Sequence, residues 1–580
     1  MLRLRVRPAG RRASDDGVAA VIVAIALVPV LFGAAAIGID LSRLNVAAQD
    51  LQRTADAAAL AGVVHLPGNE AAAISQATRV AQANAGNEAT ADATIAVAVP
   101  TGHPTQLRVS MTSVVHHVFA GLLGVQDNTV TRSATADYTA PLVLGSPCNV
   151  FGREDMPAAG GGVDQAPVGG SACVGTGQFW AGVSGPSLDK GFGDAYASNW
   201  CVWPSGARAT AQCAPGGEGP TPPGTNLQFR PDGYTYVVRV TKPGQLRVQG
   251  YDLAWAPAGP RCVGVLDETS PTGLAVPLAG AETVVANEFV NVTPEPVNPR
   301  YAPLPTDYCT GDTQQPYPYA DTEPSALQMR TTFELRAPDV SATQAGALLC
   351  PATVAPGFNG LTTTFAQLLA PGAGGAAGME LRREFHRWAD ICPETTVTPG
   401  DYVLRVTTSE GSGANRFALR AWLSDAAGGG MIDGAVSVVA RERMGVYTNF
   451  TAGESTFHLV RLDSSAAGGT LEVGVFDIGD AAVPVDVTLL SPDSDTPIGP
   501  CTITGAITET AARCSVRAAS EVTNGQWVNF AIPIPPDYRC PADGDQARCW
   551  VRVRITAPSD VFDATTWIAK MAGDPVRLIE

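Results

Sequence analysis

The sequence predicts an N-terminal transmembrane helix and a small α+β domain, followed by a mainly β region with two antiparallel, jelly-roll-like β-sandwiches. Three observations support this fold class. An uncharged apolar segment occupies residues 18–39. Short segments of alternating apolar and polar residues, separated by turn residues, dominate after residue 230. Four of these segments recur in the same order, which indicates a duplicated unit.

The apolar segment begins at Val18, ends at Ile39 and contains Pro29 near its middle. A helix needs about 20 apolar residues, rising about 1.5 Å each, to cross a hydrocarbon core of about 30 Å. A membrane helix tolerates one proline because nearby groups satisfy the freed backbone. The segment is therefore predicted to span a membrane.

Charged residues on either side of the span predict its direction. Residues 1–17 form a basic N-terminus, and Asp40 follows the span directly. The basic residues that set the orientation are Arg3, Arg5, Arg7, Arg11 and Arg12. Because positive charge stays on the cytoplasmic side, residues 40–580 are expected to be extracytoplasmic.

A cleaved secretory signal is the alternative interpretation of the same segment. Signal peptides have an apolar stretch of about 7–15 residues that ends at a small-residue cleavage site. The alanines at 34–36 would suit such a site. The greater length of the apolar stretch favours a retained anchor.

Composition bounds the function and the compartment. The formal net charge of −17 argues against nucleic acid as a partner, because phosphates require a basic surface. All 12 cysteines lie between Cys148 and Cys549, which is expected for disulfides formed in an oxidising compartment. Proximity in sequence suggests four pairs: Cys501 with Cys514, Cys540 with Cys549, Cys201 with Cys213, and Cys148 with Cys173. No CxxC pair supports a zinc site instead.

Helical periodicity continues through residues 40–64, and a second helix is expected over 69–85. Residues 95–100, 106–115 and 129–138 alternate as strands do. Together they predict a small α+β domain over residues 40–140. Residues 141–229 are rich in Gly, Pro and Cys and are interpreted as a disulfide-bonded module or a linker.

The N-terminal region resembles TadG-like proteins of the Tad (tight adherence, Flp) pilus assembly system over about residues 14–140. The matching residues are Gly17, Pro29, Asp40, Leu51, Gln52, Ala55, Asp56, Ala57, Ala58, Ala59, Leu60, Ala61 and Gly62. The resemblance implies a single-pass protein of the bacterial cytoplasmic membrane, with a TadG-like helical stalk and α+β domain over residues 40–140. It also implies the Tad pilus machinery or pilin proteins as partners, beside membrane lipid.

The sequence departs from the related families at two points. Tad pseudopilins carry glutamate at the fifth position after a processing glycine, whereas Ile22 holds that position after Gly17. Cleavage by a prepilin peptidase and polymerisation into a fibre are therefore not expected. Some TadG-like proteins also carry a DxSxS metal motif, but the nearest string, at residues 339–343, ends in threonine and is predicted to be a turn.

The internal repeat predicts the two sandwiches. Residues 234–254 parallel 455–479, and 332–339 parallel 487–493. Residues 402–406 parallel 550–554, and 417–422 loosely parallel 566–571. A first sandwich is therefore expected over 230–425, enlarged by an insertion near 255–328, and a second over 445–580.

No catalytic residue and no cofactor are predicted, because the motifs GxSxG, HExxH, GxxxxGK[ST] and GxGxxG are all absent. His116 and His117 are neighbours on an expected strand, so they point to opposite faces and cannot share a metal. Acidic turns are weak calcium candidates that read mainly as turns. They contain Asp477, Asp480, Asp543 and Asp545.

Two functions remain open from the sequence. The first is a membrane-anchored, extracytoplasmic structural component of pilus assembly without catalysis. The second is a cell-surface glycan- or protein-binding module that uses the Tad-like segment only as an anchor. Tryptophans in expected strands could stack on envelope glycan, although core packing is their usual role. They are Trp388, Trp422, Trp527, Trp550 and Trp567.

Overall fold

The structure is a computed structural model that describes part of the chain. The described residues are 16–66, 69–84, 91–103, 105–119, 127–138, 141–152, 179–199, 201, 213–214, 225–255, 263–264, 274–277, 283–286, 290–291, 312–314, 329–339, 345–357, 388–425, 431–450, 452–492, 494–541, 548–559, 561–573 and 576–579. The chain forms two compact units. The first comprises Met1–Ala140 with Asp574–Glu580, and the second comprises Pro141–Gly573.

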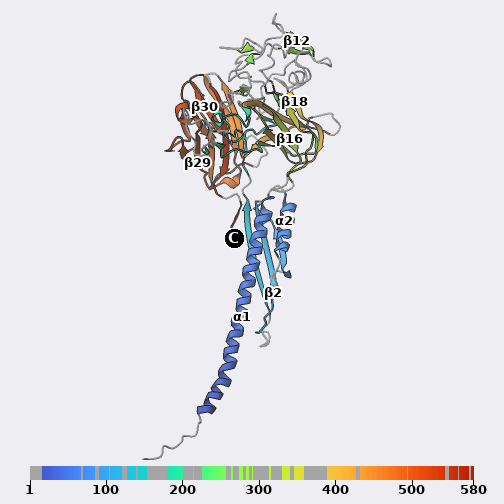
Figure 1. Cartoon of the computed structure of the whole chain (residues 1–580), viewed down its shortest axis with the longest axis vertical. Coiled ribbons are helices and arrows are strands. Elements are labelled where there is room, and N and C mark those ends of the chain that lie inside the picture. The colour runs from blue at the N-terminus through green and yellow to red at the C-terminus, as the bar shows by residue number, and fades with distance from the viewer. Residues whose placement is uncertain are drawn as a thin grey trace, which may run out of the picture. The chain divides into compact units, whose positions relative to one another are not determined.

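The first unit is built around one long helix, α1 (Asp16–Val63) (Figure 1). The apolar segment and the predicted helix beyond it are therefore one continuous rod. A shorter helix, α2 (Glu70–Ala83), begins where the Asn69 side chain accepts a hydrogen bond from the Ala72 N–H group. An antiparallel sheet completes the unit in the order β1-β2-β3-β32. Its strands are β1 (Thr94–Ala98), β2 (Gln106–Val115), β3 (Asn128–Tyr138) and β32 (Val576–Leu578).

The C-terminal half of α1 packs against α2 and the sheet through small side chains. Its buried positions recur at helical spacing, so one stripe faces the core. Alanine and glycine along this stripe allow the backbones to approach closely. The buried residues of this core are Leu51, Ala55, Ala58, Ala59, Val63, Leu66, Ala73, Ala77, Ala81, Leu107, Val109, Met111, Ala134 and Ala136.

The last strand of the chain returns to this first unit. In β32, Val576 pairs with Tyr138, Arg577 with Asp137, and Leu578 with Ala136. The second sandwich was expected to run to residue 580, but its final strand belongs to the N-terminal sheet instead. The second unit is therefore inserted between β3 and β32.

Two large antiparallel sheets form the second unit. The 12-stranded sheet follows the path β18-β10-β20-β6-β22-β31-β24-β29-β26-β27, and β15 and β5 also pair with β20. Its strands are β18 (Trp388–Val397), β10 (Gly244–Tyr251), β20 (Gly413–Ser424), β6 (Trp180–Ser184), β22 (Arg443–Phe450), β31 (Val561–Met571), β24 (Thr470–Phe476), β29 (Trp527–Pro533), β26 (Cys501–Gly505), β27 (Glu509–Ala511), β15 (Thr313–Gln314) and β5 (Val150–Phe151).

The 10-stranded sheet has the order β17-β16-β19-β9-β21-β4-β23-β30-β25-β28. Its strands are β17 (Thr353–Ala355), β16 (Thr331–Arg336), β19 (Gly400–Thr408), β9 (Tyr234–Val240), β21 (Val436–Arg441), β4 (Val143–Leu144), β23 (Gly453–Arg461), β30 (Trp550–Ala557), β25 (Val485–Leu490) and β28 (Ser515–Ala518).

The two large sheets pack face to face, as in a β-sandwich. Aromatic rings meet between them: Phe333 of β16 lies 5.2 Å from Phe417 of β20, measured between ring centroids. In the other half, Phe457 of β23 lies 5.7 Å from Trp567 of β31. These contacts are edge-to-face, which is a favoured aromatic geometry.

Short elements complete the second unit. Three two-stranded ribbons are β7 (Cys213–Ala214) with β8 (Thr225–Asn226), β11 (Val263–Gly264) with β14 (Val290–Asn291), and β12 (Leu274–Pro277) with β13 (Thr283–Ala286). Single helical turns are η3 (Lys190–Phe192), η6 (Ser464–Ala466) and α6 (Ser520–Thr523).

The internal repeat corresponds to a repeated topology. In the 10-stranded sheet, the order β16-β19-β9 in the first half matches β25-β30-β23 in the second. In the other sheet, β10-β20 matches β24-β31. Each matched pair comes from the corresponding repeat segments of the sequence. The two halves are therefore arranged as copies of one sandwich.

Strands from the Gly/Pro/Cys-rich region join the two halves. β6 lies between β20 and β22, and β4 lies between β21 and β23. β21 in turn pairs with β9 of the first half. Since both sheets run through these strands without a break, the parts expected at 141–229 and 230–425 lie in one compact unit with residues 445–573 of the part expected at 445–580.

Candidate membrane anchor and assembly unit

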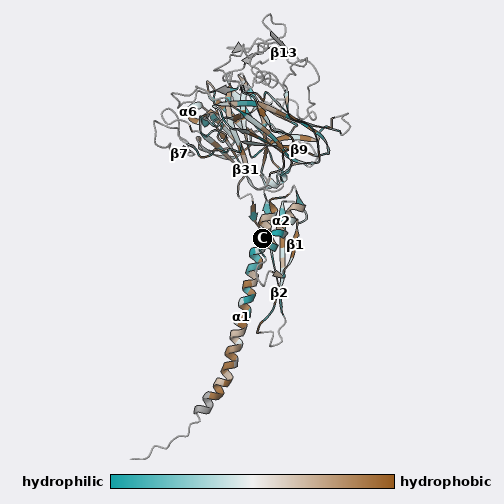
Figure 2. Cartoon of the chain, turned by 45° about the vertical axis from the view of Figure 1, so that its right-hand side comes forward, coloured by the Kyte–Doolittle hydropathy of each residue, from teal (hydrophilic) through white to brown (hydrophobic). Residues whose placement is uncertain are grey.

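The described side chains of α1 from Val21 to Ile39 are apolar on all sides of the helix. Among the described residues, α1 is the one helix long and apolar enough to cross a membrane, and its most apolar window has a mean hydropathy of 2.6 with none of it buried (Figure 2). A helix that is apolar all round suits lipid rather than water. Exposed large side chains on this half are Val21, Ile22, Val23, Ile25, Leu27, Val28, Val30, Leu31, Phe32, Ile37 and Ile39. The side chains of Val18 and Pro29 and all five orientation arginines lie outside the described residues.

Asp40 marks the end of this apolar half. It follows Ile39 directly and is only 4 % exposed. The Val118 N–H group donates a hydrogen bond to Asp40 Oδ1 at 3.0 Å, and the Phe119 N–H group donates to Asp40 Oδ2 at 3.1 Å. The His117 side chain is also buried here, with its Nδ1 3.8 Å from Asp40 Oδ2. Asp40 therefore ties the end of the β2–β3 hairpin to the helix.

The two neighbouring histidines have different partners. His116 is largely exposed, and its Nδ1 lies 2.6 Å from Asp127 Oδ2. This hydrogen bond lowers the pKa of Asp127 below its ordinary value. His117 Nε2 instead lies 3.1 Å from the Asn128 amide nitrogen. Both histidines follow Val115, the last residue of β2, so the expectation that they lie on a strand is wrong. Each of them contacts a residue across the hairpin separately.

The residues of the Tad-like motif have identifiable packing roles. Gln52 donates from Nε2 to Asp56 Oδ1 at 2.7 Å and to the Ser133 carbonyl of β3 at 3.1 Å. This polar pair holds α1 against the strand. A side chain at Gly62 would collide with its surroundings, because a Cβ there would lie 2.5 Å from Leu107 Cδ2 and 2.7 Å from the Ala73 carbonyl oxygen. Gln52 and Gly62 of the motif therefore position α1 against α2 and the sheet.

Of the weak calcium candidates, Asp477 and Asp480 are described, whereas Asp543 and Asp545 lie outside the described residues. Asp477 has a positive φ of 64° and is fully buried. Burial raises its pKa well above the ordinary value, and burial also raises the pKa of Asp480 to about 6. In the described part of the chain, no group of three or more His, Cys, Asp or Glu side chains is placed to hold a metal ion.

Asp563 of β31 interacts electrostatically with Asp477 and was not among the residues predicted from the sequence. It is fully buried, accepts a hydrogen bond from the Gly479 N–H group at 2.7 Å, and has its pKa raised by burial. Asp477 accepts a hydrogen bond from the Gly525 N–H group. Asp477 Oδ2 and Asp563 Oδ1 are each buried without a hydrogen-bond partner. The site is therefore a buried carboxylate pair near Asp480.

In the first half of the second unit, the position that corresponds to Asp563 holds an asparagine, Asn415. Tyr251 pairs with Ala418 as Phe476 pairs with Thr566, so Asn415 corresponds to Asp563. Asp252 follows Tyr251, and it is fully buried with a positive φ of 56°, as Asp477 is after Phe476. Asn415 donates from Nδ2 to the Leu253 carbonyl at 2.9 Å. The sequence match of residues 417–422 with 566–571 is one position out of this register, so it did not bring Asn415 and Asp563 together.

Three of the five candidate tryptophans are buried. Trp527, Trp550 and Trp567 are all less than a tenth exposed, so packing occupies them. Trp388 and Trp422 are half-buried. The Arg420 guanidinium lies between them, 4.0 Å from the ring centroid of Trp388 and 5.5 Å from that of Trp422. Arg247 also lies 5.5 Å from the ring centroid of Trp422, and the Trp388 ring meets that of Tyr251 edge-on at 5.5 Å.

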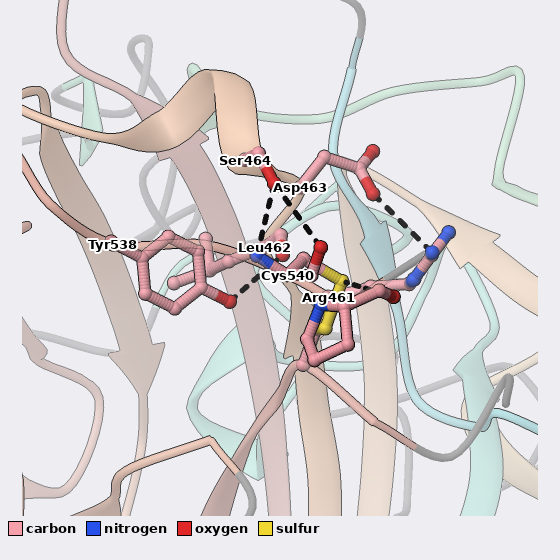
Figure 3. The surroundings of a disulfide bond; sticks show 8 residues. Arg461, Leu462, Asp463, Ser464, Tyr538 and Cys540 are labelled. Atoms are coloured by element: carbon pink, nitrogen blue, oxygen red, sulfur yellow. Dashed lines mark hydrogen bonds and ion pairs between the residues drawn. A yellow bond between two sulfur atoms is a disulfide. The ribbon is translucent and has the colours of Figure 1, made fainter. Parts of the chain in front are cut away.

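The structure contains the disulfides Cys501 with Cys514 and Cys540 with Cys549, two of the four predicted pairs. Near the second, the Cys540 N–H group donates to Ser464 Oγ at 2.9 Å, and Tyr538 donates to the Leu462 carbonyl at 3.0 Å (Figure 3). A third disulfide joins Cys350 to Cys392, which the sequence analysis did not anticipate. Cys148 and Cys201 are also disulfide-bonded. Cys173 and the side chain of Cys213 lie outside the described residues.

Within the described residues, α1 is the candidate membrane helix: its first half is apolar and exposed, and the half after Asp40 packs into a small α+β unit. Residues 17–86 match the family model described as putative Flp pilus-assembly TadE/G-like. The chain therefore contains a Tad-like domain, which comprises nearly all of α1 and the whole of α2. No curated protein matches the chain. The second unit lies outside the family match.

Proposed function

We propose that this chain is a membrane-anchored, extracytoplasmic structural component of Tad (Flp) pilus assembly that displays its second unit outside the cell and catalyses no reaction. The observation that carries the proposal is the continuity of α1. Its apolar half has no protein cover, and its other half bears the Tad-like motif. A helix of this kind suits an anchor that places an assembly domain directly at the membrane surface.

The proposed orientation rests on charge. Arginines gather before the span, and Asp40 follows it, which favours a cytoplasmic N-terminus in the bacterial cytoplasmic membrane. The disulfides of the second unit favour the oxidising side for the bulk of the chain. Both arguments agree on one topology. The partners proposed with it are membrane lipid and the Tad pilus machinery or pilin proteins.

The topology is tested on intact cells and spheroplasts. The full chain should stay in the membrane after alkaline carbonate extraction, and protease added to spheroplasts should digest the second unit. Release of the full chain into the medium, or protection of the second unit until lysis, would contradict the anchor. The assembly role is tested by deleting the gene in a cell that builds Tad pili. Loss of surface pili, restored by the full chain but not by a chain with a cleavable signal in place of residues 1–39, is the expected result.

The alternative function is a glycan- or protein-binding module that uses the Tad-like domain only as an anchor. The half-buried Trp388 and Trp422, with Arg420 between them, favour this candidate. Aromatic rings of this kind can stack on sugars. The full chain in detergent, applied to arrays of envelope glycans, tests it. Saturable binding that Trp422→Ala weakens would support the module, whereas pili lost on deletion without any glycan binding would favour assembly.

A further inference from the structure

The end of the β2–β3 hairpin is held at a defined point of α1. The backbone N–H groups of two consecutive residues, Val118 and Phe119, donate hydrogen bonds to Asp40. Asp40 is almost fully buried, and the neighbouring His117 side chain is also buried against it. The position of the hairpin end along the helix is therefore determined by contacts within the first unit.

The side chains at this point face outward and are apolar. Val118 is 49 % exposed and Phe119 is 38 % exposed, although their backbones are tied to the helix. On α1 itself, Ile37 and Ile39 are exposed just before Asp40, and Leu41 just after it. Apolar side chains from two separate elements therefore meet solvent around one buried aspartate.

The distance from Asp40 to the membrane follows from the span. If residues 18–39 cross the hydrocarbon core, Asp40 lies within about one helical turn, or about 5.4 Å, of its outer boundary. The polar interface of a bilayer extends several ångströms beyond that boundary on each side. Groups bonded to Asp40 must therefore lie in or beside this interface. Aromatic side chains prefer that zone, because their rings are partly buried there.

We propose that Val118 and Phe119 insert into the outer interface of the same bilayer that α1 crosses, so that the first unit contacts the membrane at two points. The occupant of this apolar surface is lipid. Asp40 is a positioning residue, because it presents the hairpin end at the depth of the interface. Two contact points restrict rotation and tilt of the unit, which a single helix would leave free. The inference depends on the proposed anchor.

The experiment uses the full chain in phosphatidylcholine and phosphatidylglycerol vesicles. An environment-sensitive fluorescent amino acid replaces Phe119, and in separate proteins it replaces Phe32 in the span or the exposed Ser75 of α2. Lipids with a nitroxide near the headgroup or deep in the acyl chain act as quenchers, and iodide quenches from water. We expect at least twofold stronger quenching at position 119 by the shallow nitroxide than by the deep one. Position 32 should be quenched by lipid, and position 75 by iodide only.

The outcomes separate the two proposals. Quenching by lipid at position 32, with only iodide quenching at 119, would overturn the inference and leave the anchor standing. Shielding of position 119 from both lipid and iodide would show that protein covers it, and would also overturn the inference. Absence of lipid quenching at position 32 would contradict the anchor and the inference together. In an Asp40→Asn variant, shallow quenching at 119 should fall while quenching at 32 stays unchanged.

Discussion

Arg577, in the last strand, forms an ion pair with Asp137 in β3, with Arg577 Nη2 3.0 Å from Asp137 Oδ2. The two residues are 440 positions apart in the sequence. Between them lies the whole second unit, which leaves the first unit after β3 and returns to it at β32. Segments from the beginning and from the end of the chain therefore build the first unit together.

Removing residues 574–580 should destabilise the first unit, because β3 would lose its neighbour. The truncation removes the hydrogen bond that the Ile579 N–H group donates to the Thr135 carbonyl at 2.9 Å, together with the backbone pairing between β32 and β3. At about 1 kcal/mol for each backbone hydrogen bond, a loss of about 2 kcal/mol is expected. Hydrogen exchange of β3 amides measures it. Arg577→Ala is the control and should cost under about 1 kcal/mol, because its ion pair is exposed. Unchanged exchange in the truncated chain would contradict the role of β32.

Gly62→Ala should weaken the docking of α1. The new Cβ would lie 2.8 Å from Ala77 Cβ and closer still to Leu107 Cδ2, so the helices or the sheet must move. Overpacking of this kind costs about 1 to 3 kcal/mol. Gly38→Ala is the matched control, since no atom lies within 4 Å of its added Cβ. Thermal unfolding of the full chain in detergent compares the two. Equal unfolding midpoints for both variants would show that the structure accommodates a methyl group at position 62 without loss of stability.

Gln52→Ala should loosen the contact between α1 and β3. It removes the bonds to Asp56 and to the Ser133 carbonyl, and a cost of about 1 kcal/mol is expected. Gln49, which is exposed on the same helix, provides the control variant Gln49→Ala. The readout is hydrogen exchange at Ser133 and its neighbours. If the amides exchange at the same rate in both glutamine variants, the hydrogen bonds of Gln52 do not stabilise the contact between α1 and β3.

Asp563→Asn should stabilise the second unit at neutral pH. Burial raises the folded-state pKa of Asp477 and Asp563 above the ordinary value of 3.8. Stability from the protonated pair is therefore complete below about pH 4 and is lost as pH rises through the raised folded-state values, with Asp480 titrating near 6. The variant places an amide at position 563, as the first half does at the corresponding Asn415. Because an amide does not ionise, the loss of stability with rising pH should be smaller in the variant.

Denaturant midpoints at pH 5 and pH 7.5 measure the effect, with the exposed Asp433→Asn as control. The wild type and the control should lose stability between these pH values, and Asp563→Asn should lose less. A wild-type midpoint that rises with pH would contradict the protonated pair. A midpoint raised by calcium in the wild type but not in Asp563→Asn would show that the carboxylates hold a cation instead.

The second half of the second unit should not fold alone. A fragment of residues 445–573 lacks β4, which pairs with β23, and β6, which pairs with β22. Both strands come from residues 141–229, so β22 and β23 would be left as open edges. Residues 141–573 should give dispersed amide NMR signals, and the shorter fragment should aggregate or give collapsed signals. A well-dispersed spectrum from the fragment would show that the joining strands are dispensable.

Features with a local pattern could be predicted from the sequence. The long apolar helix, its continuation and the strands of the repeat each follow from the spacing of apolar residues. The pairs Cys501 with Cys514 and Cys540 with Cys549 were found because their members are close in sequence. Cys350 and Cys392 were not paired, because 42 positions separate them in the sequence and only the fold brings them to a Cα distance of 5.8 Å.

The candidate sites divide in the same way. Asp40 and Gln52 belong to a recognisable motif, but their partners at Phe119 and Ser133 lie in another element. Asp477 was singled out from its turn, whereas Asp563 sits in an ordinary strand and carries no local signal. Burial, which raises the pKa of both carboxylates, is a property of the packed sheets alone.

By itself, the sequence determined the long apolar helix, the Tad-like helix and the type of each repeated strand, since these depend on the periodicity of neighbouring residues. Only the tertiary structure decided that β32 closes the first sheet and that β4 and β6 unite the two halves. Those strands are short, and their partners lie far along the chain. The choice among such partners depends on the burial and backbone hydrogen bonds of the whole sheet, which no local pattern records.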